Sequence, residues 1–178
     1  MRVIGGTSRG RRLSAAVPKD VRPTTDRVKE AIFDMIFSLG GIEDDKVVDL
    51  FCGTGGLGIE ALSRGAAQAT FVDASHEAIA ATEANLKAVG LASVASRVQR
   101  NSLPGFRPPE PVQWVFADPP YGFQNFDELL IGFEGATAII ESRDAPVLGA
   151  PWSVLKTRRY GTTLVTVAIT EPAKGDNQ

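Results

Sequence analysis

The chain has 178 residues, of which 43% are hydrophobic and 22% charged, as in an ordinary globular protein with one core. No apolar stretch approaches the roughly 18 residues that cross a membrane, and no apolar run follows the basic first residues as in a secretion signal. One cysteine excludes an internal disulfide, and one cysteine with one histidine is too few for a usual metal site. We therefore expect a cytoplasmic protein that uses no metal.

Charge is distributed unevenly along the chain, although the net charge is only −2. Residues 1–30 contain eight Lys and Arg but three Asp and Glu, a charge of +5, which leaves −7 for the rest. A basic segment on an acidic body indicates contact with a polyanion, although a solvated basic face would look the same.

The N-terminal residues 1–20 are expected to form a basic arm, in which two short strands between residues 2 and 17 make a small β-hairpin. Residues 21–178 would form the single main domain. Apolar residues at three- and four-residue spacing predict a helix that begins after the N-cap Thr25 and ends at Gly40-Gly41.

Beyond this helix, strands and helices alternate. Strands are expected at residues 46–51, 70–73, 97–100, 112–117 and 137–142, and helices at 57–64, 75–89 and 127–133. The last two strands, 153–159 and 162–169, would form a hairpin that turns at Tyr160-Gly161. This order predicts an α/β fold with a mostly parallel sheet, to which the hairpin adds an antiparallel member.

Glycines follow the first buried strand, in the stretch Asp49-Leu50-Phe51-Cys52-Gly53-Thr54-Gly55-Gly56-Leu57-Gly58. They let a ligand approach the backbone closely, and the pattern G-x-G-x-x-G with Asp73 about 20 residues on is typical of dinucleotide binding. However, Asp49 would repel a pyrophosphate and attract a cationic amino-acid moiety. S-adenosylmethionine, which has an adenosine and an amino group but no phosphate, is therefore the favoured ligand.

The stretch Ala117-Asp118-Pro119-Pro120-Tyr121-Gly122 follows another apolar strand. Asp118 can accept one N–H of an exocyclic amine and the Pro119 carbonyl can accept the other, because prolines donate no N–H. Tyr121 offers a ring for stacking. The element suits a flat base with an amine, although a Pro-Pro turn that merely ends a strand is the alternative.

Four blocks of the sequence together resemble the bacterial 16S ribosomal RNA guanine-N2 methyltransferase family (RsmD-like): Arg2-Val3-Ile4-Gly5-Gly6 with Arg9-Gly10-Arg11, Arg22-Pro23-Thr24-Thr25-Asp26-Arg27-Val28, the glycine loop, and Asp118-Pro119-Pro120-Tyr121. The resemblance implies a class I methyltransferase with a Rossmann-like sheet and an N-terminal hairpin that contacts RNA. It also implies methyl transfer from S-adenosylmethionine to the N2 amine of a guanine in small-subunit ribosomal RNA.

The resemblance assigns roles to particular positions. The cofactor would contact Asp49, Phe51, Gly53, Gly55, Asp73 and Asn101. The target base would contact Asp118, Pro119, Pro120 and Tyr121. We expect RNA phosphates to contact Arg9, Arg11, Arg12, Arg22 and Arg27. Residues 141–151 match the family poorly, so no site residue is expected there.

Three other functions remain open from the residues alone. An adenine-N6 DNA methyltransferase would use the same Asp-Pro-Pro-Tyr element, but the chain has little room for a DNA-reading domain. An NAD-dependent oxidoreductase would use the glycine loop, and a non-catalytic RNA-binding module would keep only the scaffold. Cys52 lies within the glycine loop and is interpreted as a small packing residue.

Overall fold

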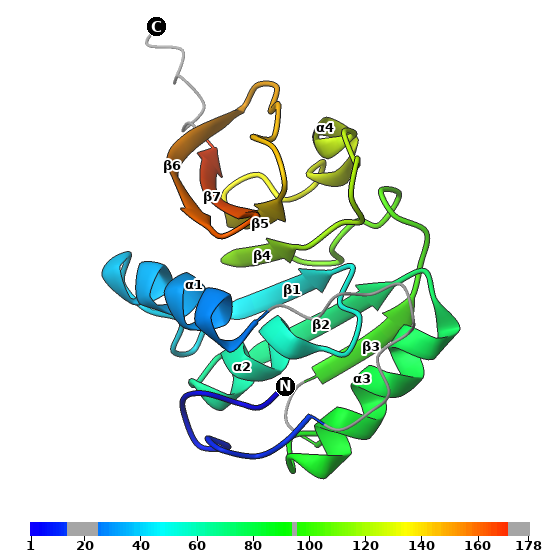
Figure 1. Cartoon of the computed structure of the whole chain (residues 1–178). Helices are drawn as coiled ribbons and strands as arrows, with labels where there is room; N and C mark the ends of the chain where they lie inside the picture. The colour runs from blue at the N-terminus through cyan, green and yellow to red at the C-terminus, as the bar shows by residue number, and fades with distance from the viewer. Residues whose placement is uncertain (14–24, 94–95, 171–178) are drawn as a thin grey trace, which may run out of the picture.

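A seven-stranded sheet with the order β3-β2-β1-β4-β5-β7-β6 forms the centre of the protein (Figure 1). The structure is a computed structural model that describes residues 1–13, 25–93 and 96–170. The parallel strands are β1 (Lys46–Leu50), β2 (Gln68–Asp73), β3 (Ser96–Arg100), β4 (Trp114–Ala117) and β5 (Thr137–Ser142). The hairpin strands β6 (Trp152–Tyr160) and β7 (Thr163–Thr170) pair antiparallel, β7 next to β5. This confirms the predicted mixed sheet.

The sheet separates two apolar clusters. Helices α1 (Asp26–Ser38), α2 (Gly56–Ser63) and α3 (His76–Ala88) contribute to the cluster on one face, and α4 (Phe126–Leu129) with its following loop contributes to the other. Successive strand residues point to opposite faces. Val47 accordingly belongs to the first cluster and Val48 to the second. Among the described residues, no helix is long and apolar enough to span a bilayer.

Helix α1 begins and ends where the sequence predicts. The Thr25 hydroxyl accepts a hydrogen bond from the Val28 N–H at 3.3 Å, which satisfies a donor at the start of the helix. Ile32, Phe33 and Ile36 share the buried face. Gly40, with a φ of 119°, lies just past the last turn, where a residue with a Cβ would be strained.

Several predicted boundaries are wrong. Strand β2 begins two residues earlier than expected, and β4 begins two residues later. The helix expected near residues 127–133 is the single turn α4, because the chain turns at Gly132, whose φ of 86° is not helical. The C-terminal hairpin turns at Gly161-Thr162, one residue later than expected, since Tyr160 pairs with Thr163. Gly161 has a φ of 62°, which its missing Cβ permits.

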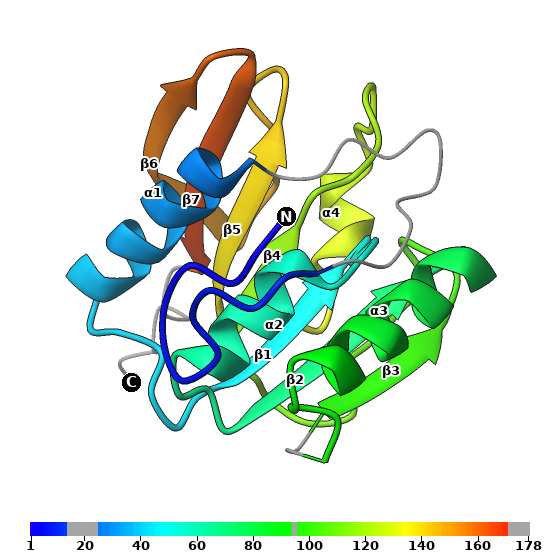
Figure 2. The ribbon, with the colours of Figure 1, turned by 60° about the horizontal axis from the view of Figure 1, so that its bottom comes forward.

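The N-terminal segment 1–13 packs along α2 (Figure 2). Within these residues Arg2 and Arg12 form an antiparallel bridge, and the N–H groups of Val3 and Leu13 donate to the carbonyls of Arg11 and Met1, so the two ends of the segment pair as in the expected small hairpin. Residues 14–17 lie outside the described residues. The N–H groups of Ile4 and Gly5 donate to the Glu60 carboxylate of α2 at 2.9 and 2.7 Å, which fixes this hairpin on the helix.

Candidate active site

A cleft of about 1220 Å³ opens at the carboxyl ends of the central strands. Its lining includes residues that follow β1, β2, β4 and β5, and it extends to the turn between β6 and β7. Strands β1 and β4 are neighbours, with β2 and β3 on one side and β5 on the other. In an open α/β sheet, ligands bind at this reversal of strand order, beyond the carboxyl ends.

Acidic side chains follow several of these strands. Asp73 ends β2, Asp118 follows β4 and Glu141 is near the end of β5, and all three line the cleft. Each stands two positions after a residue of the apolar cluster that packs against α1 and α2: Phe71, Phe116 and Ile139, respectively. Because strand side chains alternate between faces, the three carboxylates are on the same face of the sheet.

The glycine loop is held in place from two sides. Asp73 accepts hydrogen bonds from the N–H groups of Gly53 at 3.0 Å and Ser75 at 2.9 Å. Helix α3 supplies donors to the loop carbonyls: the Thr82 hydroxyl to Gly53 at 3.0 Å and the Asn85 amide to Thr54 at 2.9 Å. A carboxylate has about four lone-pair sites, so Asp73 retains acceptor capacity toward a ligand hydroxyl in the cleft.

Asp49 lies behind the loop rather than on the cleft wall. It is buried, and its carboxylate accepts a hydrogen bond from the Gly58 N–H of α2 at 2.8 Å. Burial raises the pKa of Asp49 to about 8, and the nearby Asp118 and Asp73 add to this, while the Gly58 hydrogen bond opposes it. The group is therefore mostly protonated at neutral pH in the ligand-free protein.

Aromatic rings line one side of the cleft. The Phe51 ring contacts Phe123 edge to face at a centroid distance of 5.4 Å, and Phe123 contacts Phe126 at 5.1 Å. Phe51 has a φ of 57°, a strained conformation for a residue with a Cβ and one that clusters at functional sites. The exposed Tyr121 ring has the Arg143 guanidinium 5.9 Å from its centre.

The structure brings together many, but not all, of the predicted site residues. Those that line the cleft are Phe51, Gly53, Asp73, Arg27 and the whole stretch Asp118 to Tyr121. Gly55 caps α2 in a left-handed conformation, and the backbone N–H of the exposed Asn101 donates to the Asp73 carbonyl of β2. Arg9, Arg11 and Arg12 are exposed on the N-terminal segment, away from the cleft lining, and Arg22 lies outside the described residues.

Other cleft residues were not anticipated. We expected no site residue between 141 and 151, yet residues 141–147 line the cleft. Ser75, Phe123 and Tyr160 also contribute to the lining. One signal was available for Glu141, because it is a carboxylate near the end of an apolar strand, as Asp49 and Asp73 are. Its place beside the stretch Asp118 to Tyr121 depends on the pairing of β4 with β5, which cannot be predicted from neighbouring residues alone.

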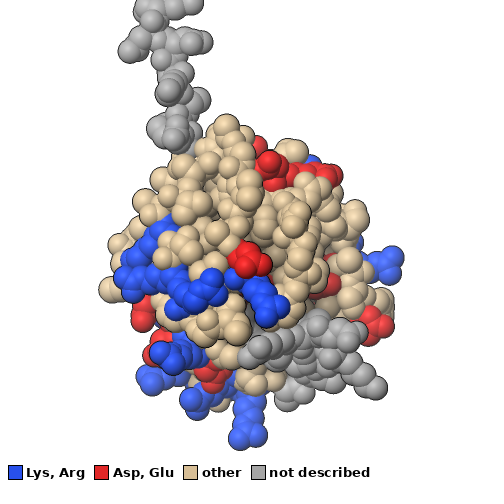
Figure 3. Space-filling model, turned by 45° about the horizontal axis from the view of Figure 1, so that its top comes forward, with Lys and Arg blue, Asp and Glu red and all other residues tan. Residues whose placement is uncertain are grey.

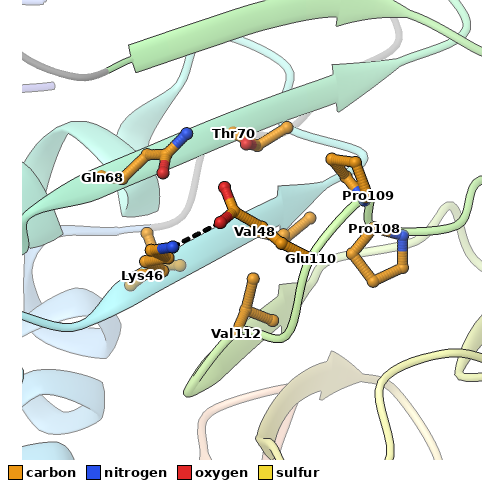
Figure 4. Close-up of a pocket in the computed structure, with 9 residues that line it drawn as sticks. Lys46, Val48, Gln68, Thr70, Pro108, Pro109, Glu110 and Val112 are labelled. Atoms are coloured by element: carbon orange, nitrogen blue, oxygen red, sulfur yellow. Dashed lines mark hydrogen bonds and ion pairs between the residues drawn. The ribbon is translucent and has the colours of Figure 1, made fainter.

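A second hollow, of about 10 Å³, lies between β1, β2 and residues 108–112 (Figure 4). Lys46 and Glu110 form an ion pair across it, as the dashed line in Figure 4 shows. Its size suits about one water molecule. Within the parts of the chain that the structure describes, no group of three or more His, Cys, Asp or Glu side chains could hold a metal ion.

Comparison with known proteins places this fold and cleft in a family. The family model described as Conserved hypothetical protein 95, the RsmD family, matches residues 1–169. The chain belongs to the RsmD family. Ribosomal RNA small subunit methyltransferase D from Haemophilus influenzae is 31% identical over 175 residues, which are 90% of this chain and 89% of that protein.

A second RsmD-family relative, Ribosomal RNA small subunit methyltransferase D from Escherichia coli, is 40% identical over 124 residues. The match covers 68% of this chain and 60% of the relative. The solved structure of yhhF from Escherichia coli superimposes with a TM-score of 0.81 at 32% identity and covers 96% of this chain and 98% of that chain. The RsmD-family chain thus has the class I methyltransferase fold, with a Rossmann-like sheet.

Proposed function

We propose that this protein transfers a methyl group from S-adenosylmethionine to the exocyclic N2 amine of a guanine in 16S ribosomal RNA, in the cytoplasm. The observation that carries the proposal is the single cleft that joins the glycine loop and Asp73 to the stretch Asp118 to Tyr121. The two relatives, each named as a small-subunit ribosomal RNA methyltransferase, support the class of substrate.

The glycine-loop end of the cleft fits S-adenosylmethionine. Asp73 offers acceptors for ribose hydroxyls, Gly53 has no side chain to obstruct a ligand, and the Phe51 ring provides an apolar wall near a sulfonium. Asp49, behind the loop, supports α2 and adds negative charge when ionised. When bound, S-adenosylmethionine supplies a methyl group on a positively charged sulfur that keeps the electron pair of the broken bond.

The other part of the cleft suits a base turned out of the RNA. The N2 amine of guanine is a weak nucleophile because its lone pair is delocalised into the ring. Hydrogen bonds to the Asp118 carboxylate and the Pro119 carbonyl would draw the nitrogen toward tetrahedral geometry and localise that pair, and Asp118 would take the proton that the nitrogen loses as the methyl group is transferred. The exposed Tyr121 ring would stack on the flipped base. Positioning and electrostatics would therefore supply most of the catalysis.

A basic strand leads to this cleft. Lys156, Arg158 and Arg159 are exposed on β6, the edge strand of the sheet, and the next residue, Tyr160, lines the cleft. Arg27 and Arg143 add positive charge at the cleft itself. Figure 3 turns this end of the molecule forward and shows Lys and Arg side chains gathered at its left. RNA phosphates would contact β6 as well as the N-terminal arginines.

The test is methyl transfer from radiolabelled S-adenosylmethionine to small ribosomal subunits that lack the modification. Free 16S RNA and duplex DNA are assayed in parallel, and the labelled nucleoside is identified and mapped. N2-methylguanosine from the ribosomal samples alone is the expected result, and the ratio of subunit to free RNA reports which form is recognised. Methyladenine in DNA would instead mean that the Asp-Pro-Pro-Tyr element binds adenine and that the protein is an adenine-N6 DNA methyltransferase.

In the same assay, Asp118→Ala should lose transfer by about two orders of magnitude or more, because the amine loses a charged acceptor. Its affinity for S-adenosylmethionine, measured by calorimetry, should stay within about twofold, a difference of only ~0.4 kcal/mol. Asp34→Ala, a change at an exposed carboxylate on α1 outside the cleft lining, is the matched control. Normal turnover by the Asp118 variant would remove this residue from the mechanism.

A further inference from the structure

Glu141 is a buried carboxylate on the wall of the cleft, and the reaction as described above does not use it. Its exposed fraction is 4%, although it belongs to an apolar strand between Ile140 and Ser142. Keeping a carboxylate at such a position is unfavourable unless hydrogen-bond donors or positive charge meet it. Because Glu141 also lines the cleft, its carboxylate can meet a bound substrate in addition to its partners in the protein.

The strand register places Glu141 beside Asp118. Ala117, the last residue of β4, pairs with Ile140 of β5 in the parallel ladder, and Asp118 and Glu141 are the next residues along the chain. Neighbouring strands are about 4.8 Å apart, so the two carboxylates extend from adjacent points on the same face of the sheet. Both line the same cleft, where the target base is proposed to bind.

A base that donates hydrogen bonds to both carboxylates needs two adjacent donor groups on one edge of its ring. Guanine presents its N2 amine next to the N1–H, so the two groups form such a pair. Adenine and cytosine also carry an exocyclic amine, but the ring nitrogen beside it is an acceptor, whose lone pair would face a carboxylate. Among the four bases, guanine therefore combines an amine with an adjacent N–H donor.

We propose that Glu141 selects guanine by accepting a hydrogen bond from its N1–H while Asp118 holds the N2 amine. This inference rests on the proposed guanine-N2 transfer and adds the residue that excludes adenine from an Asp-Pro-Pro-Tyr site. A carboxylate has about four lone-pair sites, so Glu141 can bind the base and keep other partners. A site that pairs a buried polar group with the substrate discriminates strongly against an analogue that lacks the matching group.

The alternative occupant of neighbouring carboxylates is a cation. Within the described residues, however, the carboxylates of this cleft do not converge as a possible set of metal ligands. The surroundings instead suit a flat ring, since Tyr121 offers an exposed face and Pro119 and Pro120 extend the wall. The geometry favours a base over an ion.

The test reverses each partner of the contact in turn: the base donor is replaced by an acceptor, and the Glu141 acceptor by a side chain that can donate. 2-Aminopurine retains the 2-amine of guanine but has an acceptor at N1. It is placed at the mapped nucleotide in a synthetic RNA segment, which is ligated into 16S RNA and assembled into subunits. Wild-type protein, Glu141→Gln and the control Glu43→Gln, at an exposed carboxylate just before β1, are compared on guanine and 2-aminopurine substrates.

Wild-type protein and the control should prefer guanine by at least about tenfold in kcat/KM. Glu141→Gln should lose roughly tenfold to hundredfold on guanine and gain on 2-aminopurine, because the Gln amide donates to the N1 acceptor. A general structural defect would lower both rates equally, and that result, or no change on either substrate, would overturn the role of Glu141. If wild-type protein methylates guanine at N2, such a failure leaves the proposed function intact; if it methylates adenine instead, both proposals fall.

Discussion

Two aspartates that the sequence places alike, each at the end of an apolar strand, differ in their surroundings. Asp118 is partly exposed and lines the cleft, so it can meet a substrate directly. Asp49 is buried behind the glycine loop and accepts the Gly58 N–H. The same side chain therefore has two environments: Asp118 is open to the cleft, where we propose that it binds the base, and Asp49 is enclosed and supports α2.

The buried Asp49 should make stability depend on pH. Its pKa is about 8 in the folded protein and about 3.8 when unfolded, so between these values the folded state holds a proton that the unfolded state has released. This carboxyl therefore lowers the free energy of unfolding by about 1.4 kcal/mol for each pH unit from about 4 to 8.

Asp49→Asn removes the titration and keeps an oxygen for the Gly58 N–H. The free energy of unfolding of the variant minus that of the wild type, measured in urea without cofactor, should increase by about 1.4 kcal/mol for each pH unit from pH 5 to pH 7. Subtracting wild type from variant cancels the other titrating groups. A difference that stays constant with pH would mean that Asp49 is already ionised in the folded protein.

At the level of elements, Glu60 of α2 joins three parts of the chain. It accepts the N–H groups of Ile4 and Gly5, and it forms ion pairs with Lys29 of α1 at 3.4 Å and with Arg64 at 2.9 Å. Lys29 and Glu60 are fully buried, and Lys29 also donates to the Arg2 carbonyl. Burial lowers the pKa of Lys29, while Glu60 acts in the opposite direction.

Glu60→Ala should destabilise the protein by about 3–5 kcal/mol, because it leaves the Lys29 charge and two backbone donors without their acceptor. Replacing both partners, Lys29→Met with Glu60→Met, should recover part of this loss, since no buried charge remains. Urea unfolding measures both, with Glu30→Ala on the exposed face of α1 as the control. If Glu60→Ala is as stable as the wild type, the network around Glu60 contributes little to stability.

At the scale of the whole molecule, two basic surfaces are candidates for contact with RNA, and both can contribute. Arg9, Arg11 and Arg12 are on the N-terminal segment that packs on α2, whereas Lys156, Arg158 and Arg159 are on β6 and lead to the cleft. The excess of Lys and Arg in the first thirty residues indicates the N-terminal set. The set on β6 becomes evident only in the fold, where this strand leads to the cleft. Both are exposed, so each can reach phosphates without unfolding.

Changing each basic set to Gln should separate their contributions. Removing three phosphate contacts should reduce the slope of log affinity against log salt by about two to three. We expect this for the β6 variant and for the N-terminal variant, measured by RNA binding from low to moderate salt. An unchanged slope in one of them would exclude that surface, and the double substitution Lys87→Gln with Arg107→Gln, at exposed positions outside both sets, serves as the control.

Local sequence determined most of the elements and the two motif-bearing turns. Period-two and period-3.6 patterns, with glycine and proline at the boundaries, identify the sheet strands and α1 to α3, because these signals depend on neighbouring residues. They also place Asp118 and Asp73 at strand ends, where an α/β sheet opens its ligand crevice. Tertiary structure alone decided which of these residues meet.

The pairing of β4 with β5 places Glu141 beside Asp118, and the packing of α1 on α2 buries Lys29 against Glu60. Glu60 also holds the N-terminal hairpin on α2 through the N–H groups of Ile4 and Gly5. These contacts join residues that are distant in the chain. They depend on which surfaces are buried together, and no short stretch of sequence encodes that choice.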